Sequence, residues 1–264
     1  MRIDLTGRTA LVTASTQGIG AAIAAGLAAA GARVGVNGRD AGRVDEAVRR
    51  LRAEVPDGDF VAVVADVVSE EGAASVLAAM PDVDVLVNNL GVYRSQDPLD
   101  ITDADWRRYF EVNVLAAVRL TRGYLPRMLE RDWGRVQYIA SESAVAIPAE
   151  MIHYGTTKTA MLALGRGFAK KAAGTGVTVN SVLAGPTRTA GVEEFVRDLV
   201  GRDLPWEEAE RIFMRDHRPQ SLLRRLIAPA EIANMVVYLA SDQASATTGG
   251  ALRVDGGCVD AVIP

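Results

Sequence analysis

Tyr154 and Lys158 are the two residues whose types and spacing most clearly allow chemistry in this chain. They stand four residues apart, so on a helix a phenol and an ammonium share one face. A cation at that distance favours the phenolate and lowers the pKa of a tyrosine from its ordinary value near 10. The same spacing also occurs where a lysine simply packs beside a ring on a solvated helix. The pair therefore needs support from residues elsewhere in the sequence.

The composition is that of an ordinary folded protein of 264 residues. Hydrophobic residues make up 49% and charged residues 23%, and no tract is polar enough to indicate disorder. A net charge of -4 gives no general attraction to nucleic acid or to an anionic membrane, so we expect neither as a partner. Cys258 is the single cysteine, and residues 1–5 lack the apolar stretch of a signal peptide. These features predict a cytoplasmic protein.

Apolar runs of strand length alternate with segments of helical period, as in doubly wound α/β proteins. The predicted parallel strands lie at residues 9–13, 33–36, 60–65, 83–87, 135–140, 177–183 and 251–254. The predicted helices lie at residues 20–30, 40–53, 69–80, 103–131, 152–173 and 229–240. No linker or repeat divides the chain, so we expect one domain over residues 1–264. It should hold a Rossmann-like sheet of about seven parallel strands, with helices on both faces.

The stretch from Thr187 to Ile227 breaks this alternation. It carries aromatic residues among eight arginines and eight carboxylates. We predict a helical flap over the substrate, with a salt-bridged surface because its charges are balanced.

A glycine-containing turn, Thr13 to Gly20, joins the first strand to the first helix. Glycines in such a turn let the backbone approach a pyrophosphate, and the helix N-terminus supplies N–H donors. An ordinary tight turn is the alternative, but the strand before and the helix after favour phosphate binding.

The second strand ends in Asn37, Gly38 and Arg39, where a dinucleotide-binding sheet selects between NAD and NADP. Arg39 can pair with a 2′-phosphate, which a carboxylate would repel. This favours NADP, with NAD as the alternative. In the competing interpretation Arg39 is merely solvated and Asp40 caps the next helix. Gln17 supplies no second cation from the turn.

Ser141 follows a predicted strand, and Asn113 lies in the middle of a predicted long helix. Together with the glycine turn, Asp66, Asn88 to Gly91, the Tyr154–Lys158 pair and Gly185 to Thr189, these residues resemble the short-chain dehydrogenase/reductase family over nearly the whole chain.

The resemblance implies a role for each matching residue. Tyr154 would be the acid/base, Lys158 would lower its pKa and hold the nicotinamide ribose, and Ser141 would hydrogen-bond the substrate oxygen. Asn113 would position a water that links Lys158 to solvent. Ser143 joins Ser141 and Tyr154 as a substrate-binding candidate. The cofactor-binding candidates are Thr13, Ser15, Gln17, Gly18, Ile19, Gly20, Asn37, Arg39, Asp66, Val67, Asn88, Gly91, Tyr154, Lys158, Gly185, Thr187 and Thr189.

Three residues depart from the family pattern. Ala14 replaces a glycine, and we expect it to use ordinary dihedral angles because its Cβ disfavours positive φ. Leu90 replaces a small residue and is expected to reshape the wall near the nicotinamide. Ala184 stands where proline is common and could shift the start of the flap.

Metal chemistry has no support in the sequence, because His153 and His217 are far apart and there is one cysteine. His153 adjoins Tyr154 but points about 100° away from it on a helix, which favours packing over catalysis.

The predicted function is transfer of a hydride between NADP(H) and a secondary alcohol/ketone pair. An NAD-dependent alcohol or polyol dehydrogenase is the nearest alternative, and a catalytically silent nucleotide sensor is the alternative from another class. The resemblance also implies a homo-oligomer, a tetramer or a dimer, joined through the helices that contain Asn113 and Tyr154.

Overall fold

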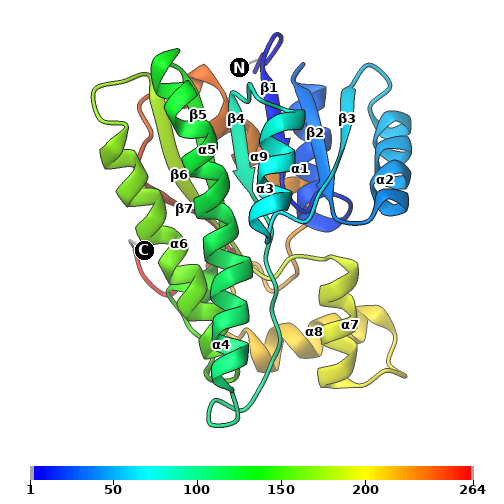
Figure 1. Ribbon diagram of the computed structural model, residues 1–264. Helices are drawn as coiled ribbons and strands as arrows, with labels where there is room; N and C mark the ends of the chain where they lie inside the picture. The colour runs from blue at the N-terminus through cyan, green and yellow to red at the C-terminus, as the bar shows by residue number, and fades with distance from the viewer. Residues whose placement is uncertain (1–2, 263–264) are drawn as a thin grey trace.

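The computed structural model describes residues 3–262, and these residues build one parallel sheet with strand order β3-β2-β1-β4-β5-β6-β7 (Figure 1). The strands are β1 (Thr9–Val12), β2 (Arg33–Gly38), β3 (Asp59–Val64), β4 (Val85–Asn88), β5 (Gly134–Ser141), β6 (Val177–Ala184) and β7 (Ala251–Val254). The predicted Rossmann-like sheet of about seven parallel strands is confirmed. The strand order reverses between β1 and β4, and ligands of such sheets bind beyond the carboxyl ends at that point.

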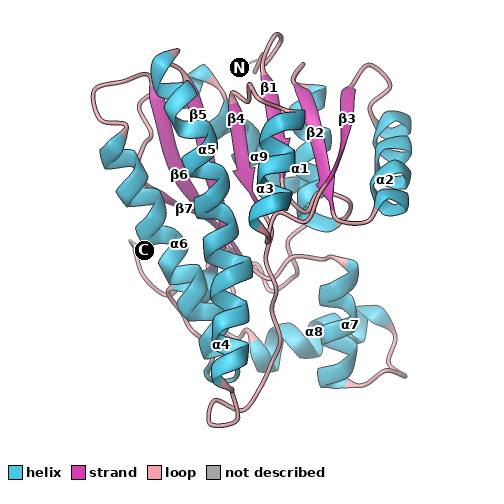
Figure 2. Ribbon diagram, in the orientation of Figure 1, coloured by secondary structure: helices cyan, strands magenta, loops and turns pink. Residues whose placement is uncertain are grey.

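Helices cover both faces of the sheet (Figure 2). One layer holds α1 (Gly18–Ala29), α2 (Ala41–Glu54) and α9 (Pro229–Ala240). The other holds α3 (Glu70–Ala79), α5 (Ala116–Glu130) and α6 (Ile152–Lys171). Strand residues alternate between the layers, so Ala10 and Val12 pack in the first core while Leu11 packs in the second. No helix within residues 3–262 is both long and apolar enough to span a membrane.

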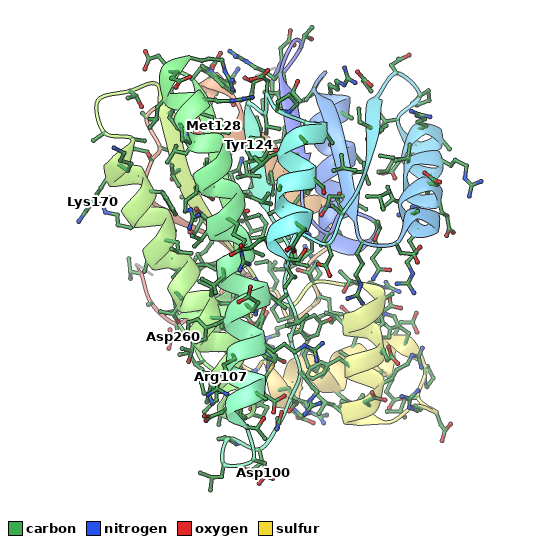
Figure 3. The ribbon with its side chains drawn as sticks, in the orientation of Figure 1. Asp100, Arg107, Tyr124, Met128, Lys170 and Asp260 are labelled. Carbon is green, nitrogen blue, oxygen red and sulfur yellow. The ribbon has the colours of Figure 1, made fainter. Side chains whose placement is uncertain are left out.

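The predicted helix at residues 103–131 is broken into three pieces. They are α4 (Asp103–Phe110), a π-helical turn (Glu111–Leu115) and α5. Tyr124 and Met128 anchor α5 as buried side chains (Figure 3). Asn113 lies in the π turn, where its amide holds the backbone of Val92 instead of facing solvent. The interruption therefore tilts one side chain of a long helix toward the carboxyl edge of the sheet.

The flap predicted between Thr187 and Ile227 forms two helices, α7 (Ala190–Val200) and α8 (Trp206–His217), below the carboxyl ends of the strands (Figure 1). Its two ends meet, since Thr187 and Ile227 form an isolated parallel bridge. Phe213 and Val196 lie in a small core of its own. The remaining short elements are 3₁₀ turns at Glu142–Ala144, Ala149–Met151 and Asp242–Ala244.

Candidate active site

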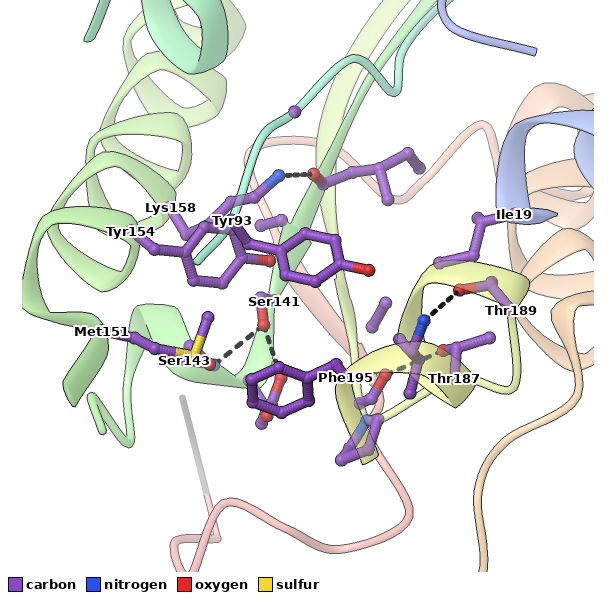
Figure 4. A pocket seen from close by; sticks show the side chains of 18 of the residues that line it. Ile19, Tyr93, Ser141, Ser143, Met151, Tyr154, Lys158, Thr187, Thr189 and Phe195 are labelled. Atoms are coloured by element: carbon purple, nitrogen blue, oxygen red, sulfur yellow. Dashed lines mark hydrogen bonds between the residues drawn. The ribbon is translucent and has the colours of Figure 1, made fainter. Parts of the chain in front are cut away.

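A cavity of about 180 Å³ lies at the carboxyl ends of β4, β5 and β6, between the start of α6 and the flap (Figure 4). Tyr154, Lys158, Ser141 and Ser143 all line it, so the end of β5 and the start of α6 bring these side chains to one cavity. The other lining residues are Ile19, Asn89, Gly91, Tyr93, Ile139, Ala140, Glu142, Met151, Ala184, Gly185, Pro186, Thr187, Thr189, Val192, Phe195, Phe213 and Arg218.

Tyr154 lies on one wall of this cavity, with the Lys158 Nζ 5.6 Å from its ring centroid. Burial raises the pKa of the Tyr154 phenol, and only its hydrogen bond with Ser141 opposes that rise. Lys158 is not among the causes of this shift, so the prediction that Lys158 lowers the pKa of Tyr154 stays a prediction. Tyr154 is therefore a protonated phenol near neutral pH.

Lys158 is 4% exposed, and its ammonium donates to the carbonyl oxygen of Ile139 at 2.8 Å. Burial lowers its pKa from 10.5 to about 8. Gly91 allows this position, because a Cβ there would lie 3.2 Å from the Lys158 Nζ and 3.6 Å from the Asn113 Oδ1. Gly91, Asn113 and Lys158 thus meet beside Tyr154.

Asn113 is fixed by three hydrogen bonds. Its Oδ1 accepts from the Val92 N–H at 2.8 Å, and its Nδ2 donates to the Val92 carbonyl at 3.1 Å and to the Thr157 Oγ1 at 3.0 Å. The side chain is completely buried. It connects the loop after β4 with α6, one residue from Lys158.

Ser141 ends β5, and its hydroxyl donates to the Glu142 Oε2 at 2.5 Å while accepting from the Ser143 N–H at 3.1 Å. Sequence reasoning placed Ser141 and Ser143 at the substrate but missed Glu142. The carboxyl of Glu142 is 5% exposed and burial raises its pKa, whereas Ser141 and the Arg218 guanidinium lower it. The one signal in the sequence that could have indicated Glu142 is its position directly after Ser141.

The turn between β1 and α1 is held together by its own polar side chains. The Ser15 hydroxyl donates to the Val12 carbonyl at 2.7 Å and accepts from the Asn37 N–H at 2.9 Å. The Thr13 hydroxyl accepts from the N–H of Asn89 at 2.9 Å. These side chains are buried, so Thr13 and Ser15 shape the turn and leave its backbone to meet a ligand.

Ala14 adopts φ +51°, so the expectation of ordinary dihedral angles there is wrong. Asn89 explains how the strain is tolerated, because its Nδ2 donates to the carbonyls of both Thr13 (3.0 Å) and Ala14 (3.1 Å). The turn keeps its shape without a glycine at this position.

The first turn of α1 has the features of a phosphate cradle. Gln17 is the N-cap residue, is exposed, and makes no side-chain capping hydrogen bond. At Gly20 a Cβ would lie 2.5 Å from the Ala14 carbonyl, so glycine is required there. Gly18 has φ +58° and a Cβ on it would lie 3.2 Å from Thr189, which brings the flap entrance against the turn. Ile19 reaches the cavity of Tyr154.

A second cavity flanks the other side of the turn, lined by Ala14 and Thr16. Its lining includes four predicted cofactor residues: Asn37, Arg39, Asp66 and Val67. Arg43 of α2 also lines it and was missed, although it supplies the second cation that Gln17 does not. Leu90 lies here too, so its predicted place near the nicotinamide is wrong: Gly91, the next residue, faces Tyr154 instead.

Asp40 caps α2 by accepting from the Arg43 N–H at 2.9 Å, as the competing interpretation of this segment held. Arg39 is exposed, and neither it nor Arg43 pairs with a carboxylate among residues 3–262. Both interpretations are thus compatible with the geometry of Arg39.

The remaining predicted cofactor residues separate into two groups. Gly185, Thr187 and Thr189 line the cavity of Tyr154. Asn88 is buried and lines neither of these two cavities, and its Nδ2 lies 3.4 Å from the Thr121 Oγ1. Its predicted cofactor contact stays a prediction.

His153 is a core residue, in agreement with its predicted packing role. It is completely buried, its ring centroid lies 4.0 Å from that of Tyr109, and Trp106 contacts it edge-on at 6.2 Å. It does not line the cavity of Tyr154.

Comparison with known proteins places this geometry in a family. A family model described as enoyl-(acyl carrier protein) reductase matches residues 13–259. The oxidoreductase YvaG of Bacillus subtilis is 46% identical over 263 residues, which cover 99% of this chain and 100% of that protein. The chain belongs to the short-chain dehydrogenase/reductase family. This confirms the resemblance seen in the sequence, and with it the prediction of an oxidoreductase enzyme.

Solved structures agree with that assignment. The L-sorbose reductase of Gluconobacter frateurii, complexed with NADPH and L-sorbose, superimposes with a TM-score of 0.91 at 31% identity, covering 99% of this chain and 100% of that one. A putative NAD(P)-dependent gluconate 5-dehydrogenase from Beutenbergia cavernae, with bound NADP, gives 0.85 at 35% identity, with coverage of 99% and 100%.

Proposed function

We propose that this protein is an NADP(H)-dependent oxidoreductase that interconverts a ketone and a secondary alcohol, with Tyr154 as acid/base. The observation that carries the proposal is the meeting of Tyr154, Ser141 and Lys158 in one cavity beside the glycine turn. A module that only senses nucleotide would need the turn but no protonated phenol at the substrate end.

The residues present fit a dinucleotide. Gly18, Gly20 and the uncapped start of α1 would hold the pyrophosphate, and Thr189 and Lys158 would hold the nicotinamide end. When bound, the cofactor supplies or accepts the hydride at the substrate carbon.

Tyr154 would give its proton to the substrate oxygen during reduction, since its raised pKa keeps it protonated. Ser141 would hydrogen-bond the same oxygen. Lys158, held by the Ile139 carbonyl and beside Asn113, would keep positive charge near the oxygen as negative charge develops there.

The preference for NADP is supported by the two arginines at the second cavity. Arg39 and Arg43 offer guanidinium groups to a 2′-phosphate, while the nearby Asp40 carboxylate accepts from the Arg43 backbone. The L-sorbose reductase and gluconate dehydrogenase that resemble this chain bind NADPH and NADP. NAD is the alternative cofactor.

The substrate side of the cavity is largely apolar, with Met151, Val192, Phe195 and Phe213 around the polar centre. We infer that the substrate is a small carbonyl compound or alcohol and that the flap at 187–227 covers it. We also propose that residues 1–264 act as one domain.

A homo-oligomer in the cytoplasm is proposed as well. Phe110 and Leu115, near the π turn, are 37% and 42% exposed apolar side chains on the helices expected to join subunits. Light scattering of the purified protein tests the assembly: a monomer at every concentration contradicts it.

The function is tested with a panel of carbonyl compounds and alcohols that includes L-sorbose, gluconate, a β-keto ester and a cyclic ketone. Nicotinamide absorbance is followed with each of the two cofactors. Turnover with NADPH that exceeds turnover with NADH is expected. Tight NADPH binding with no turnover of any compound would instead support the nucleotide sensor.

A further inference from the structure

The hydroxyl of Ser141 has one proton, and in the structure that proton is directed at Glu142. Ser141 Oγ donates to Glu142 Oε2 at 2.5 Å and accepts from the Ser143 N–H at 3.1 Å. A hydroxyl has one O–H donor and two acceptor lone pairs. With both of these bonds made, Ser141 has one lone pair left, which accepts from Tyr154 in the structure and can accept from a substrate hydroxyl, and it has no proton to offer.

This arrangement suits the binding of an alcohol and does not suit the binding of a ketone. A ketone oxygen accepts hydrogen bonds and cannot donate them, whereas an alcohol donates its O–H. While Glu142 accepts the hydrogen bond of the Ser141 hydroxyl, Ser141 can accept a hydrogen bond from a substrate alcohol. To hold a ketone, Ser141 needs its proton back, and a protonated Glu142 that donates to Ser141 would release it.

We propose that Glu142 is a positioning residue whose proton decides whether Ser141 donates or accepts a hydrogen bond at the substrate oxygen. The inference rests on the proposed function. No proton of Glu142 is consumed: hydride and the Tyr154 proton still make the alcohol, and only the direction of two hydrogen bonds changes.

The surroundings of Glu142 allow both protonation states. Arg218, just after α8, places its Nε 3.6 Å from Glu142 Oε1, which is close enough for attraction but too far for a hydrogen bond. That Nε has no hydrogen-bond partner among residues 3–262. Tyr154 of α6 and Cys258 of the C-terminal segment are close enough for the Glu142 charge to raise their pKa values, and Asp255 also raises the pKa of Cys258. The Arg218 guanidinium thus favours the charged carboxylate of Glu142, whereas burial favours the protonated carboxyl.

Proton exchange does not have to pass through the substrate cavity. Glu142 and Arg218 also line a third cavity, which Glu150, His217 and the exposed Gln220 line as well. Glu142 therefore stands between the substrate and a polar opening, where it can gain or lose a proton while substrate is bound.

The test compares wild type, Glu142→Gln and Arg218→Gln. The KM values of the ketone and of the alcohol are measured from about pH 5 to about pH 9, a range that spans documented pKa values of buried glutamates. The probes are the panel ketone that wild type reduces fastest and its alcohol. Infrared difference spectra of each protein over the same range follow the protonated carboxyl band.

In wild type, the KM for the ketone should rise at least about tenfold relative to the KM for the alcohol as Glu142 ionises, the value of one hydrogen bond to a charged group. Glu142→Gln should remove both that step and the infrared band. Arg218→Gln should move both to higher pH, because the lost cation no longer favours the carboxylate. Lys158 also titrates in this range, near pH 8, but neither variant removes its contribution.

A merely structural Glu142 would leave the ratio of the ketone KM to the alcohol KM in the Gln variant equal to that of wild type at every pH, and that result overturns the inference. An unchanged pH profile in Glu142→Gln overturns it as well. Failure of wild type to turn over any panel compound contradicts the proposed function itself, and the inference falls with it.

Discussion

Replacing Lys158 with methionine should stabilise the folded protein near neutral pH while removing activity. The fall of the Lys158 pKa from 10.5 to about 8 corresponds to about 3.5 kcal/mol, at about 1.4 kcal/mol per pH unit. The substitution also removes the hydrogen bond from the charged ammonium to the Ile139 carbonyl, worth about 1.5 kcal/mol. At pH 7 the variant should therefore be more stable by about 2 kcal/mol.

The sign follows from proton binding. Between about pH 8 and pH 10.5 the unfolded chain holds the Lys158 proton and the folded chain does not, so wild-type stability rises with pH across that window. Below it the cost of the buried charge is fully present. The advantage of the methionine variant should thus disappear by about pH 10.5, where only the lost hydrogen bond remains.

Urea unfolding followed by tryptophan fluorescence, at fixed protein concentration and several pH values, measures this difference. Lys170→Met is the matched control: Lys170 is exposed on the same helix (Figure 3), so its stability should stay within about 0.5 kcal/mol of wild type. A Lys158→Met variant that is less stable at pH 7, or whose stability difference is flat from pH 8 to 10.5, would refute the reasoning.

Three further substitutions test the nucleotide-binding side. Arg39→Asp should shift the ratio of NADPH to NADH activity toward NADH, and an unchanged ratio would mean that Arg39 is not the selector. Ala14→Gly should raise the free energy of unfolding by about 0.5–1 kcal/mol, since it relieves a positive φ at the cost of chain entropy; a loss of stability would contradict this. Gly20→Ala should destabilise by about 1–3 kcal/mol and weaken NADPH binding measured by calorimetry, because its Cβ would meet backbone. Gly167→Ala, with open space around the new Cβ in α6, is its control and should be neutral or stabilising.

The sheet and the flap were predictable because their signals are carried by many residues. Buried strands are runs of apolar residues in the sequence. The excess of charged and aromatic residues from Thr187 to Ile227 indicated an element that does not belong to the alternation of strands and helices. Its ends are held together by the bridge between those two residues. Convergence of Tyr154, Ser141 and Lys158 followed from strand ends and helix spacing, together with the family resemblance.

What could not be predicted depends on contacts between residues distant in sequence. The positive φ of Ala14 is tolerated because Asn89, from the loop after β4, holds its carbonyl. The π turn at Asn113 depends on the backbone of Val92. The proposed role of Glu142 depends on Arg218, which the flap places beside it. Without that contact, an acidic residue directly after a strand resembles an ordinary turn residue.

The most direct test of the central claim is the activity of Tyr154→Phe, which removes one hydroxyl and keeps the ring against Tyr93. The rate of ketone reduction should fall at least roughly a hundredfold, the lower range for loss of a positioned acid/base, while the protein stays folded and binds NADPH. Near-normal turnover by this variant would show that Tyr154 is not the proton donor.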